Sequence, residues 1–209
     1  MTLSQALLGF TLLAVVVTVT PGLDTVLVLR QALRGGRRTA FAAAAGICLG
    51  ALLWGLAAAA GVAALFVASA TAYAVLRWAG VVFLLYLAWG YLRSAWRGGH
   101  PRTELAAGGA DSAREAFAKG LLTDLLNPKM AVFYLTVLPL FLPSGHAPVL
   151  VGGLLAGVHA LVAFAWFTVI TLGAHAVRGF LTSRRGARAI DGAAGMAMLG
   201  FGLALGLER

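Results

Sequence analysis

Residues 130–177 read MAVFYLTVLPLFLPSGHAPVLVGGLLAGVHALVAFAWFTVITLGAHAV, a run of 48 residues that contains no Asp, Glu, Lys or Arg. A membrane-spanning helix needs about 20 consecutive, mostly apolar residues, so this run is long enough for two. Three prolines and a Ser-Gly-His segment lie between Leu138 and Val149. Because proline and glycine mark loops, they predict one span that ends near Leu142 and a second that begins near Val149.

The composition of the whole chain agrees with this prediction. Of its 209 residues, 61% are hydrophobic and 11% are charged, and the mean hydropathy is +0.92. Soluble domains average about 45–50% apolar and about 25% charged residues. A folded chain of this length still exposes much of its surface, so it could not hide this many apolar side chains from water. The composition excludes a water-soluble enzyme and a disordered chain, and it indicates a polytopic membrane protein.

Further charge-free runs predict the remaining spans. They cover residues 1–23, 39–76, 78–92 and 192–207. Divided at their breakers, all the runs together predict an all-α membrane protein with six spans, at roughly 4–30, 39–66, 72–93, 115–142, 149–177 and 188–207.

Basic residues predict how these spans are oriented. Thirteen of the 16 Lys and Arg residues lie in or beside the first, third and fifth connections. Cytoplasmic loops carry an excess of Lys and Arg, so these connections are expected in the cytoplasm and both termini outside, in a bacterial inner membrane. This arrangement explains the net charge of +9 better than nucleic-acid binding does.

A Gly- and Ala-rich connection divides the chain into two halves. We expect a three-helix half at 1–98, a cytoplasmic linker at 99–114 and a second three-helix half at 115–209, all in one membrane domain. With three spans each, the halves cross the membrane in opposite directions, which is the layout of an inverted-topology repeat.

Corresponding spans of the two halves are interrupted by proline. The first contains Thr20-Pro21-Gly22-Leu23-Asp24, and the fourth contains Asn127-Pro128-Lys129. Proline removes a backbone donor and clashes with the preceding turn. In lipid the freed backbone groups need partners in protein or at a wet cavity. Paired broken helices therefore indicate a transporter binding site, and a plain proline kink is the alternative for either break alone.

Ionisable residues accompany both breaks. A charge at the bilayer centre costs at least about 2.5–3.5 kcal/mol, so Asp24, Asp124 and Lys129 are expected to mark a pathway, a partner or a proton relay. Asp24 could instead stabilise a helix N-terminus, and Asp124 with Lys129 could be a purely structural pair. The expected substrate-binding residues are Thr20, Pro21, Gly22, Asp24, Thr25, Asn127 and Lys129, and the expected proton-coupling residues are Asp24 and Asp124.

Other chemistry is sparse in this sequence. Cys48 is the single cysteine, so neither an internal disulfide nor a thiolate metal site is expected. The chain has no phosphate-binding loop and no hydrolase or metalloprotease motif, so we expect no enzyme activity, cofactor or metal site. His159 is expected to hydrogen-bond locally, with proton relay as the alternative.

Seven short segments, taken together and in this order, carry a family resemblance. They are Thr20-Pro21-Gly22-x-Asp24, Arg34-Gly35-Gly36-Arg37-Arg38, Ala45-Gly46-x-x-x-Gly50, Leu84-Leu85-Tyr86-Leu87-Ala88-Trp89-Gly90, Phe117-x-x-Gly120, Asn127-Pro128-Lys129 and Leu138-Pro139-x-Phe141. The chain resembles the lysine-exporter (LysE) superfamily, in particular its homoserine/threonine exporter branch. It departs from that branch at Leu23, where the family usually has proline.

The resemblance implies a secondary transporter of six helices, often a homodimer, that exports amino acids or related small metabolites by proton-coupled antiport and alternating access. Its partners would be the substrate, protons and the lipid bilayer, with no nucleic acid. Two alternatives remain open at this point: a divalent metal-ion exporter of the same superfamily, and a non-transporting membrane scaffold or assembly protein.

Overall fold

The computed structural model describes residues 1–20, 22–68, 70–97, 111–174, 176 and 183–207. All regular secondary structure in these residues is helical, which confirms the predicted all-α class. Pro21 and most of the predicted linker lie outside the described residues.

The helices follow the predicted spans closely. α1 (Leu3–Val19) and α2 (Leu23–Arg34) occupy the first, and α3 (Gly36–Ala68) and α4 (Ala70–Trp96) occupy the second and third. The fourth is divided into α5 (Ala113–Leu125), α6 (Pro128–Val132), the π-helical turn η1 (Phe133–Val137) and the 3-10 turn η2 (Leu138–Phe141). α7 (Pro148–Leu172) and α9 (Arg184–Leu207) occupy the fifth and sixth.

Two helical stretches of the described chain are long and apolar enough to cross a membrane, namely Gly36–Gly61 of α3 and Pro148–Leu172, the whole of α7. Two bent pairs pass the same test: α1 with α2 turns by 55°, and α5 with Lys129–Phe141 turns by 53°. The described chain therefore holds two candidate spans, or four if each bent pair is one span. Both bends fall where proline interrupts the sequence.

Local sequence explains where several helices begin. Thr2 and Ser112 start α1 and α5 with capping boxes, in which Gln5 and Glu115 bond back to the cap residue. Gly22 stands at the N-cap of α2 and makes no side-chain capping bond. Asn127 caps α6, because its Oδ1 accepts a hydrogen bond from the Lys129 N–H at 3.0 Å. Both breaks are thus helix starts as well as helix ends.

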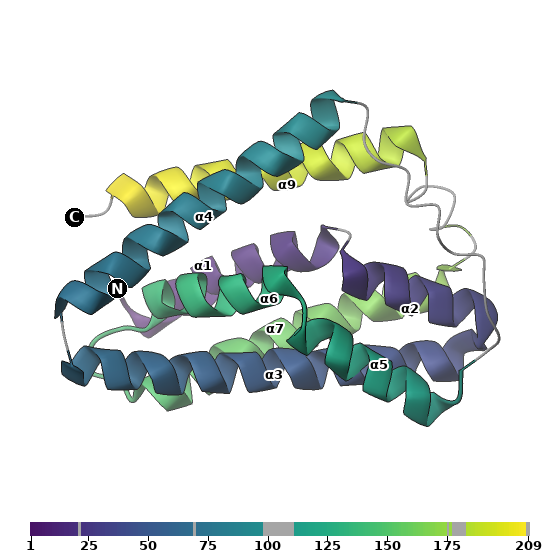
Figure 1. Cartoon of the computed structure of the whole chain (residues 1–209), viewed down its shortest axis with the longest axis horizontal. Helices are drawn as coiled ribbons and strands as arrows, with labels where there is room; N and C mark the ends of the chain where they lie inside the picture. Colours follow the sequence, from purple (N-terminus) through teal and green to yellow (C-terminus); the bar gives the residue numbers. More distant parts are fainter. Residues whose placement is uncertain (21, 69, 98–110, 175, 177–182, 208–209) are drawn as a thin grey trace.

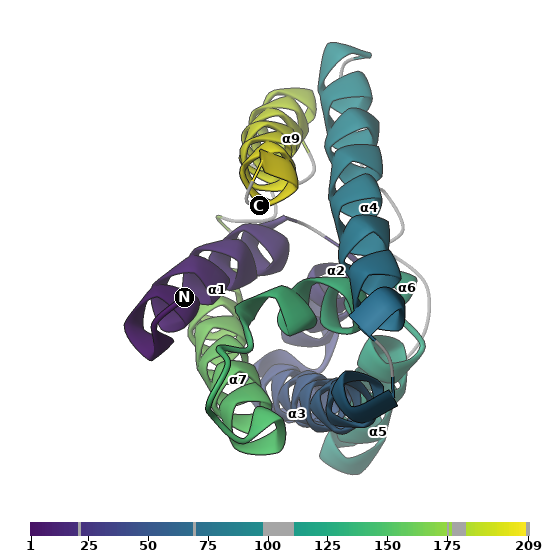
Figure 2. The same cartoon turned by 90° about the vertical axis from the view of Figure 1, so that its left-hand side faces the viewer.

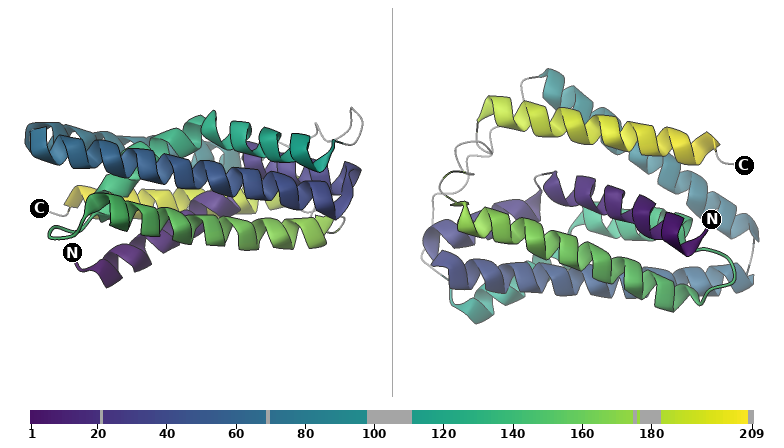
Figure 3. Two further views of the ribbon diagram at one scale, coloured as in Figure 1. Left: turned by 90° about the horizontal axis from the view of Figure 1, so that it is seen from below. Right: turned by 180° about the vertical axis from the view of Figure 1, so that it is seen from behind.

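The helices form a bundle with a flanking pair. α3 and α7 run along one side of the bundle, with α5 against α3 (Figure 1 and Figure 3). α1 and α6 lie between them and the α4–α9 pair, which packs along one edge (Figure 2). Ser94 Oγ donates to Asp191 Oδ2 at 2.6 Å, and Arg188 Nε donates to the Ala95 carbonyl at 3.1 Å, so two polar contacts join α4 to α9.

Glycines bring α3 and α5 into close contact. A Cβ added at Gly46 would lie 2.1 Å from the Phe117 carbonyl oxygen, and one added at Gly120 would lie 2.1 Å from the Ala43 carbonyl oxygen. One turn further along α3, a Cβ at Gly50 would lie 2.6 Å from Asp124 Oδ2. Small residues permit such approach between membrane helices. Here they set α3 directly beside the acidic residue of the second break.

Basic helix ends lie together. The junction of α2 with α3 and the starts of α5 and α9 are toward one end of the molecule, and the start of α1 and the end of α9 are toward the other (Figure 1). In the sequence, Arg34, Arg37, Arg38, Arg114, Arg184, Arg185 and Arg188 belong to these helix ends, which are called the basic end below. This distribution is the one from which the membrane orientation was predicted.

Candidate functional site

The two helix breaks lie against each other, and residues of the second break donate hydrogen bonds to the first. Asn127 Nδ2, at the second break, donates to Asp24 Oδ2 in the first turn of α2 at 2.9 Å. Lys129 Nζ donates to the carbonyls of Val17 at 3.1 Å and Thr20 at 3.4 Å, at the end of α1. Each bond joins residues more than 100 positions apart. The polar groups that the breaks leave in an apolar environment therefore bind across the breaks.

A small cavity lies where the breaks meet. Its volume is about 20 Å³, which suits a single water molecule, since one needs roughly 10–15 Å³. Its polar lining comes from Thr18, Asp24, Thr25, Asp124, Lys129 and His159. Apolar walls come from Val17, Ile47, Ala51, Met130, Ala163 and Phe167. Pockets for small molecules usually measure about 300–1,000 Å³, so this conformation is closed around the site.

Asp124 is the most deeply buried acid at the cavity. The residue is fully buried, at 0% exposure. Neither carboxylate oxygen has a hydrogen-bond partner among the described residues, and Asp24 Oδ1 is in the same situation. Buried polar groups are almost always hydrogen-bonded, so unpartnered carboxylate oxygens beside a cavity are groups that a ligand, a proton or water would satisfy.

The His159 side chain, from α7, forms hydrogen bonds to α1 and η1 beside the cavity. One ring nitrogen, Nε2, lies 3.1 Å from Thr18 Oγ1 in α1, and the other, Nδ1, lies 2.8 Å from the Tyr134 hydroxyl in η1. Phe10 and Phe133 approach its ring edge to face, with centroids 6.3 and 5.4 Å away. Both nitrogens thus have local partners, as the sequence led us to expect, and the residue also lines the cavity.

The predicted site residues differ in how they lie relative to the cavity. Asp24, Thr25, Asp124 and Lys129 line the cavity, and Asn127 contacts it through Asp24. Gly22 is next to the Lys129 ammonium, since a Cβ added at Gly22 would be 3.0 Å from Lys129 Nζ. Thr20 turns away, because its hydroxyl donates to the Val16 carbonyl at 2.6 Å, and Pro21 lies outside the described residues.

Sequence reasoning missed three residues that shape the site. Thr18 lies one turn before Pro21, and a hydroxyl inside an apolar run beside a break was a usable signal. Gly50 follows Gly46 at a four-residue spacing that favours close helix approach, but the sequence does not say which helix approaches. Tyr134 carried no signal, because its role depends on which helices become neighbours. Asp124 and Lys129 line the same cavity without a hydrogen bond between them, and Lys129 donates hydrogen bonds to the end of α1.

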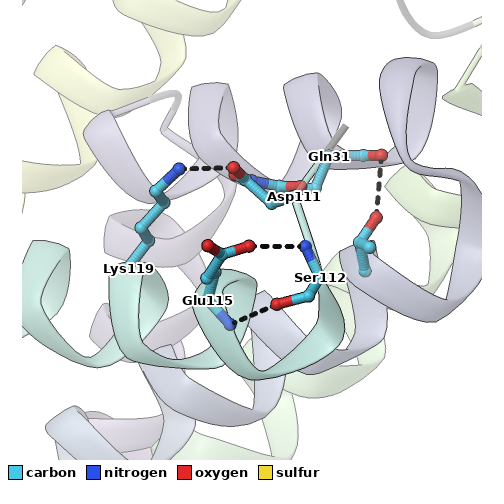
Figure 4. A network of polar contacts seen from close by, with 6 residues as sticks. Gln31, Asp111, Ser112, Glu115 and Lys119 are labelled. Atoms are coloured by element: carbon cyan, nitrogen blue, oxygen red, sulfur yellow. Dashed lines mark hydrogen bonds and ion pairs between the residues drawn. The ribbon is translucent and has the colours of Figure 1, made fainter. Parts of the chain in front are cut away.

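A second polar network lies at the basic end of the molecule (Figure 4). Gln31 of α2 is 3% exposed, and its Nε2 donates to Asp111 Oδ2 at 2.5 Å, just before α5. Lys119 Nζ donates to the other Asp111 oxygen at 2.5 Å. Together with Gln31, the Lys119 ammonium lowers the pKa of the Asp111 carboxyl below its usual value of 3.8. This network connects the half-helices that follow and precede the two breaks.

Bent apolar helices whose breaks meet around buried charges are typical of membrane transporters. Comparison with known sequences assigns the family. The chain belongs to the LysE type translocator family, whose profile matches residues 15–209. This is a family of transporters rather than of enzymes, in agreement with the sequence-based predictions of family and of class.

Three relatives illustrate the similarity. An uncharacterised membrane protein of Pseudomonas aeruginosa is 31% identical over 91% of this chain and 90% of its own length. The threonine efflux protein of Escherichia coli is 29% identical over 93% of this chain and 94% of its own. The leucine efflux protein of an Enterobacter species is 27% identical over 88% of this chain and 87% of its own length. No solved structure matches the chain significantly.

Proposed function

We propose that this protein is a secondary active exporter of amino acids or related small metabolites in the bacterial cytoplasmic membrane. The observation that carries the proposal is the closed cavity between the two helix breaks, which holds two carboxylates and an ammonium in a member of a translocator family. Relatives named for the efflux of threonine and of leucine support amino acids as the substrate class.

The charges of the cavity suit a zwitterionic substrate and a proton. When both acids are ionised, Asp24, Asp124 and Lys129 together leave one negative charge around a cavity that has room for about one water molecule. A buried net charge is costly in a membrane, so one proton on either acid would balance the site. A substrate ammonium would approach the unpartnered carboxylate oxygens. Its carboxylate would face the start of α2, near Gly22 and Thr25, where helix N–H groups and the helix dipole favour an anion.

We further propose six spans in two inverted halves, at residues 1–98 and 115–209, with both termini outside. The bent pairs α1–α2 and α5–η2 would then be corresponding elements, related by the repeat. Because the cavity is too small for an amino acid, the helices around it must move for substrate to enter, which is the requirement of alternating access. A homodimer is compatible with this arrangement.

Counterflow in proteoliposomes tests the proposal. Vesicles are loaded with unlabelled amino acids, one at a time, and uptake of the matching labelled amino acid is followed at two pH values. We expect uptake of one or a few neutral amino acids, and its loss in Asp24→Asn and Asp124→Asn. Lys119→Ala is a matched control, because it removes a charge at the basic end and leaves the cavity intact.

The other two hypotheses give different results in the same assay. A metal-ion exporter would carry divalent cations and no amino acid. The described residues contain no group of three or more His, Cys, Asp and Glu side chains that could hold a metal ion. A scaffold would show no counterflow and would tolerate Asp24→Leu. If correctly folded protein carries no amino acid, or if both Asn variants keep full pH-dependent exchange, the proposal is wrong.

A further inference from the structure

The carbonyl groups at the end of α1 accept hydrogen bonds from a lysine ammonium of the protein itself. The last carbonyls of an α-helix have no partners within the helix and form the negative end of its dipole. At the end of α1, the Thr20 N–H donates to the Val16 carbonyl, and the Thr20 hydroxyl donates to the same oxygen. Lys129 Nζ donates to the carbonyls of Val17 and Thr20. An ammonium therefore occupies the space where a dissolved cation would otherwise be attracted.

The groups around the Lys129 ammonium give it space and oxygen atoms that attract a cation. Gly22 leaves room for the ammonium, because even a single Cβ there would lie 3.0 Å from Nζ. The unpartnered oxygens of Asp24 and Asp124 line the same cavity as Lys129. Carbonyl, carboxylate and hydroxyl oxygens are the donors that hard cations such as sodium prefer. In many secondary transporters the C-terminal ends of half-helices hold the coupling sodium ion in this way.

We propose that Lys129 is a tethered cation that takes the place of a coupling sodium ion, so that this carrier works without sodium. Lys129 thereby acts as a positioning residue, which keeps α1 and α6 joined across the breaks while substrate and proton use the carboxylates. The proposal rests on the proposed function only in taking the breaks as the site of transport.

The proposal predicts that removal of the ammonium creates a sodium site. In Lys129→Ala the carbonyls of Val17 and Thr20 lose their donor, and space opens beside two carboxylates. In Lys129→Met the same space is filled with an apolar chain of similar length, so no site forms. Lys129→Met is therefore the matched control for Lys129→Ala, and Lys119→Ala controls for loss of a lysine elsewhere.

The experiment measures the thermal unfolding of purified protein in detergent, with sodium chloride replacing choline chloride at constant ionic strength. For a site with a Kd of about 10 mM, Lys129→Ala should gain roughly 3–6 °C in Tm on going from about 1 to about 150 mM sodium. The wild type, Lys129→Met and Lys119→Ala should not respond. In proteoliposomes, wild-type counterflow should be the same in sodium and in choline, and any remaining counterflow by Lys129→Ala should be stimulated by sodium.

Each outcome decides the proposal. Sodium stabilisation of Lys129→Ala alone supports it. The absence of that stabilisation, an equal shift in Lys129→Met, or a sodium requirement in the wild type overturns it. If Lys129→Ala does not fold, the sodium dependence of wild-type stability and counterflow still decides, because the proposal requires none. The Tm readout needs no substrate, so failure of the proposed amino-acid transport would appear separately, as absent counterflow with the sodium response intact.

Discussion

Replacement of Gly50 by alanine should disrupt the site through its most deeply buried acid. The added Cβ would lie 2.6 Å from Asp124 Oδ2 and 2.9 Å from Asp124 Cβ, whereas ordinary contact begins at 3.4 Å. The overlap with the carboxylate is therefore about 0.8 Å, the difference between these two distances. Asp124 is fully buried and cannot turn into solvent. Either its carboxylate moves into the cavity, or α3 and α5 separate.

The size of the effect follows from two opposing contributions. Overpacking of a well-packed interior costs about 1–3 kcal/mol. An alanine in place of a helical glycine gains up to about 1 kcal/mol through its higher helix propensity. Gly61→Ala, on the same helix, measures the gain alone, because nothing lies within 4 Å of its added Cβ. At about 2–4 °C per kcal/mol, Gly50→Ala should melt about 2–12 °C below Gly61→Ala.

Thermal unfolding in detergent and counterflow in proteoliposomes are the assays. We expect Gly61→Ala to have a Tm and a counterflow rate equal to or slightly above those of the wild type. Gly50→Ala should be less stable and should lose transport even in the fraction that remains folded, because the Asp124 carboxylate is displaced. If the two variants melt at the same temperature and transport equally well, the close approach of α3 to Asp124 described above is wrong.

Three further predictions concern the polar contacts. Asn127→Ala removes the bond to Asp24 and the cap of α6, so it should lower stability by about 1.5–3 kcal/mol in thermal unfolding and abolish counterflow. Tyr134→Phe leaves a buried nitrogen of His159 without its partner, which should cost about 1–3 kcal/mol, whereas Thr168→Val, which removes an exposed hydroxyl, should have little effect. Asp111→Asn should cost at most about 1 kcal/mol at neutral pH, because the ion pair is near the surface. The folded-state pKa of Asp111 is lowered, so its contribution is complete above the usual value of 3.8 and is lost as the pH falls through the lowered pKa. The stability difference between wild type and Asp111→Asn should therefore shrink in acid, and a difference that grows in acid would contradict the assignment.

Much of the fold could be predicted because it depends on local sequence. The length of the apolar runs and the prolines of the two breaks are properties of single segments of the chain. The predicted spans therefore agree with the described helices to within a few residues at most ends. The number of membrane crossings and the inverted repeat depend on how whole helices are placed, and these stay predictions.

The candidate site was only partly predictable for the same reason. The cost of burying charge in a membrane was enough to select Asp24, Asp124 and Lys129 as candidates. Five positions separate Asp124 from Lys129 in the sequence, and that spacing suggested a pair that the structure does not form as a hydrogen bond. Lys129 instead reaches Val17, 112 positions away.

The sequence by itself determined that this protein is an all-helical membrane protein with two proline-broken helices and charged residues at the breaks, because hydropathy, helix capping and proline geometry are local properties. Only the tertiary structure decided that Asn127 bonds to Asp24, that Lys129 caps α1 and that Gly50 lies against Asp124. Those contacts depend on which backbones pack closely enough to bring groups that are distant in the chain to hydrogen-bonding distance. Backbone packing of that kind is set by side-chain volumes on several helices at once, and no single segment encodes it.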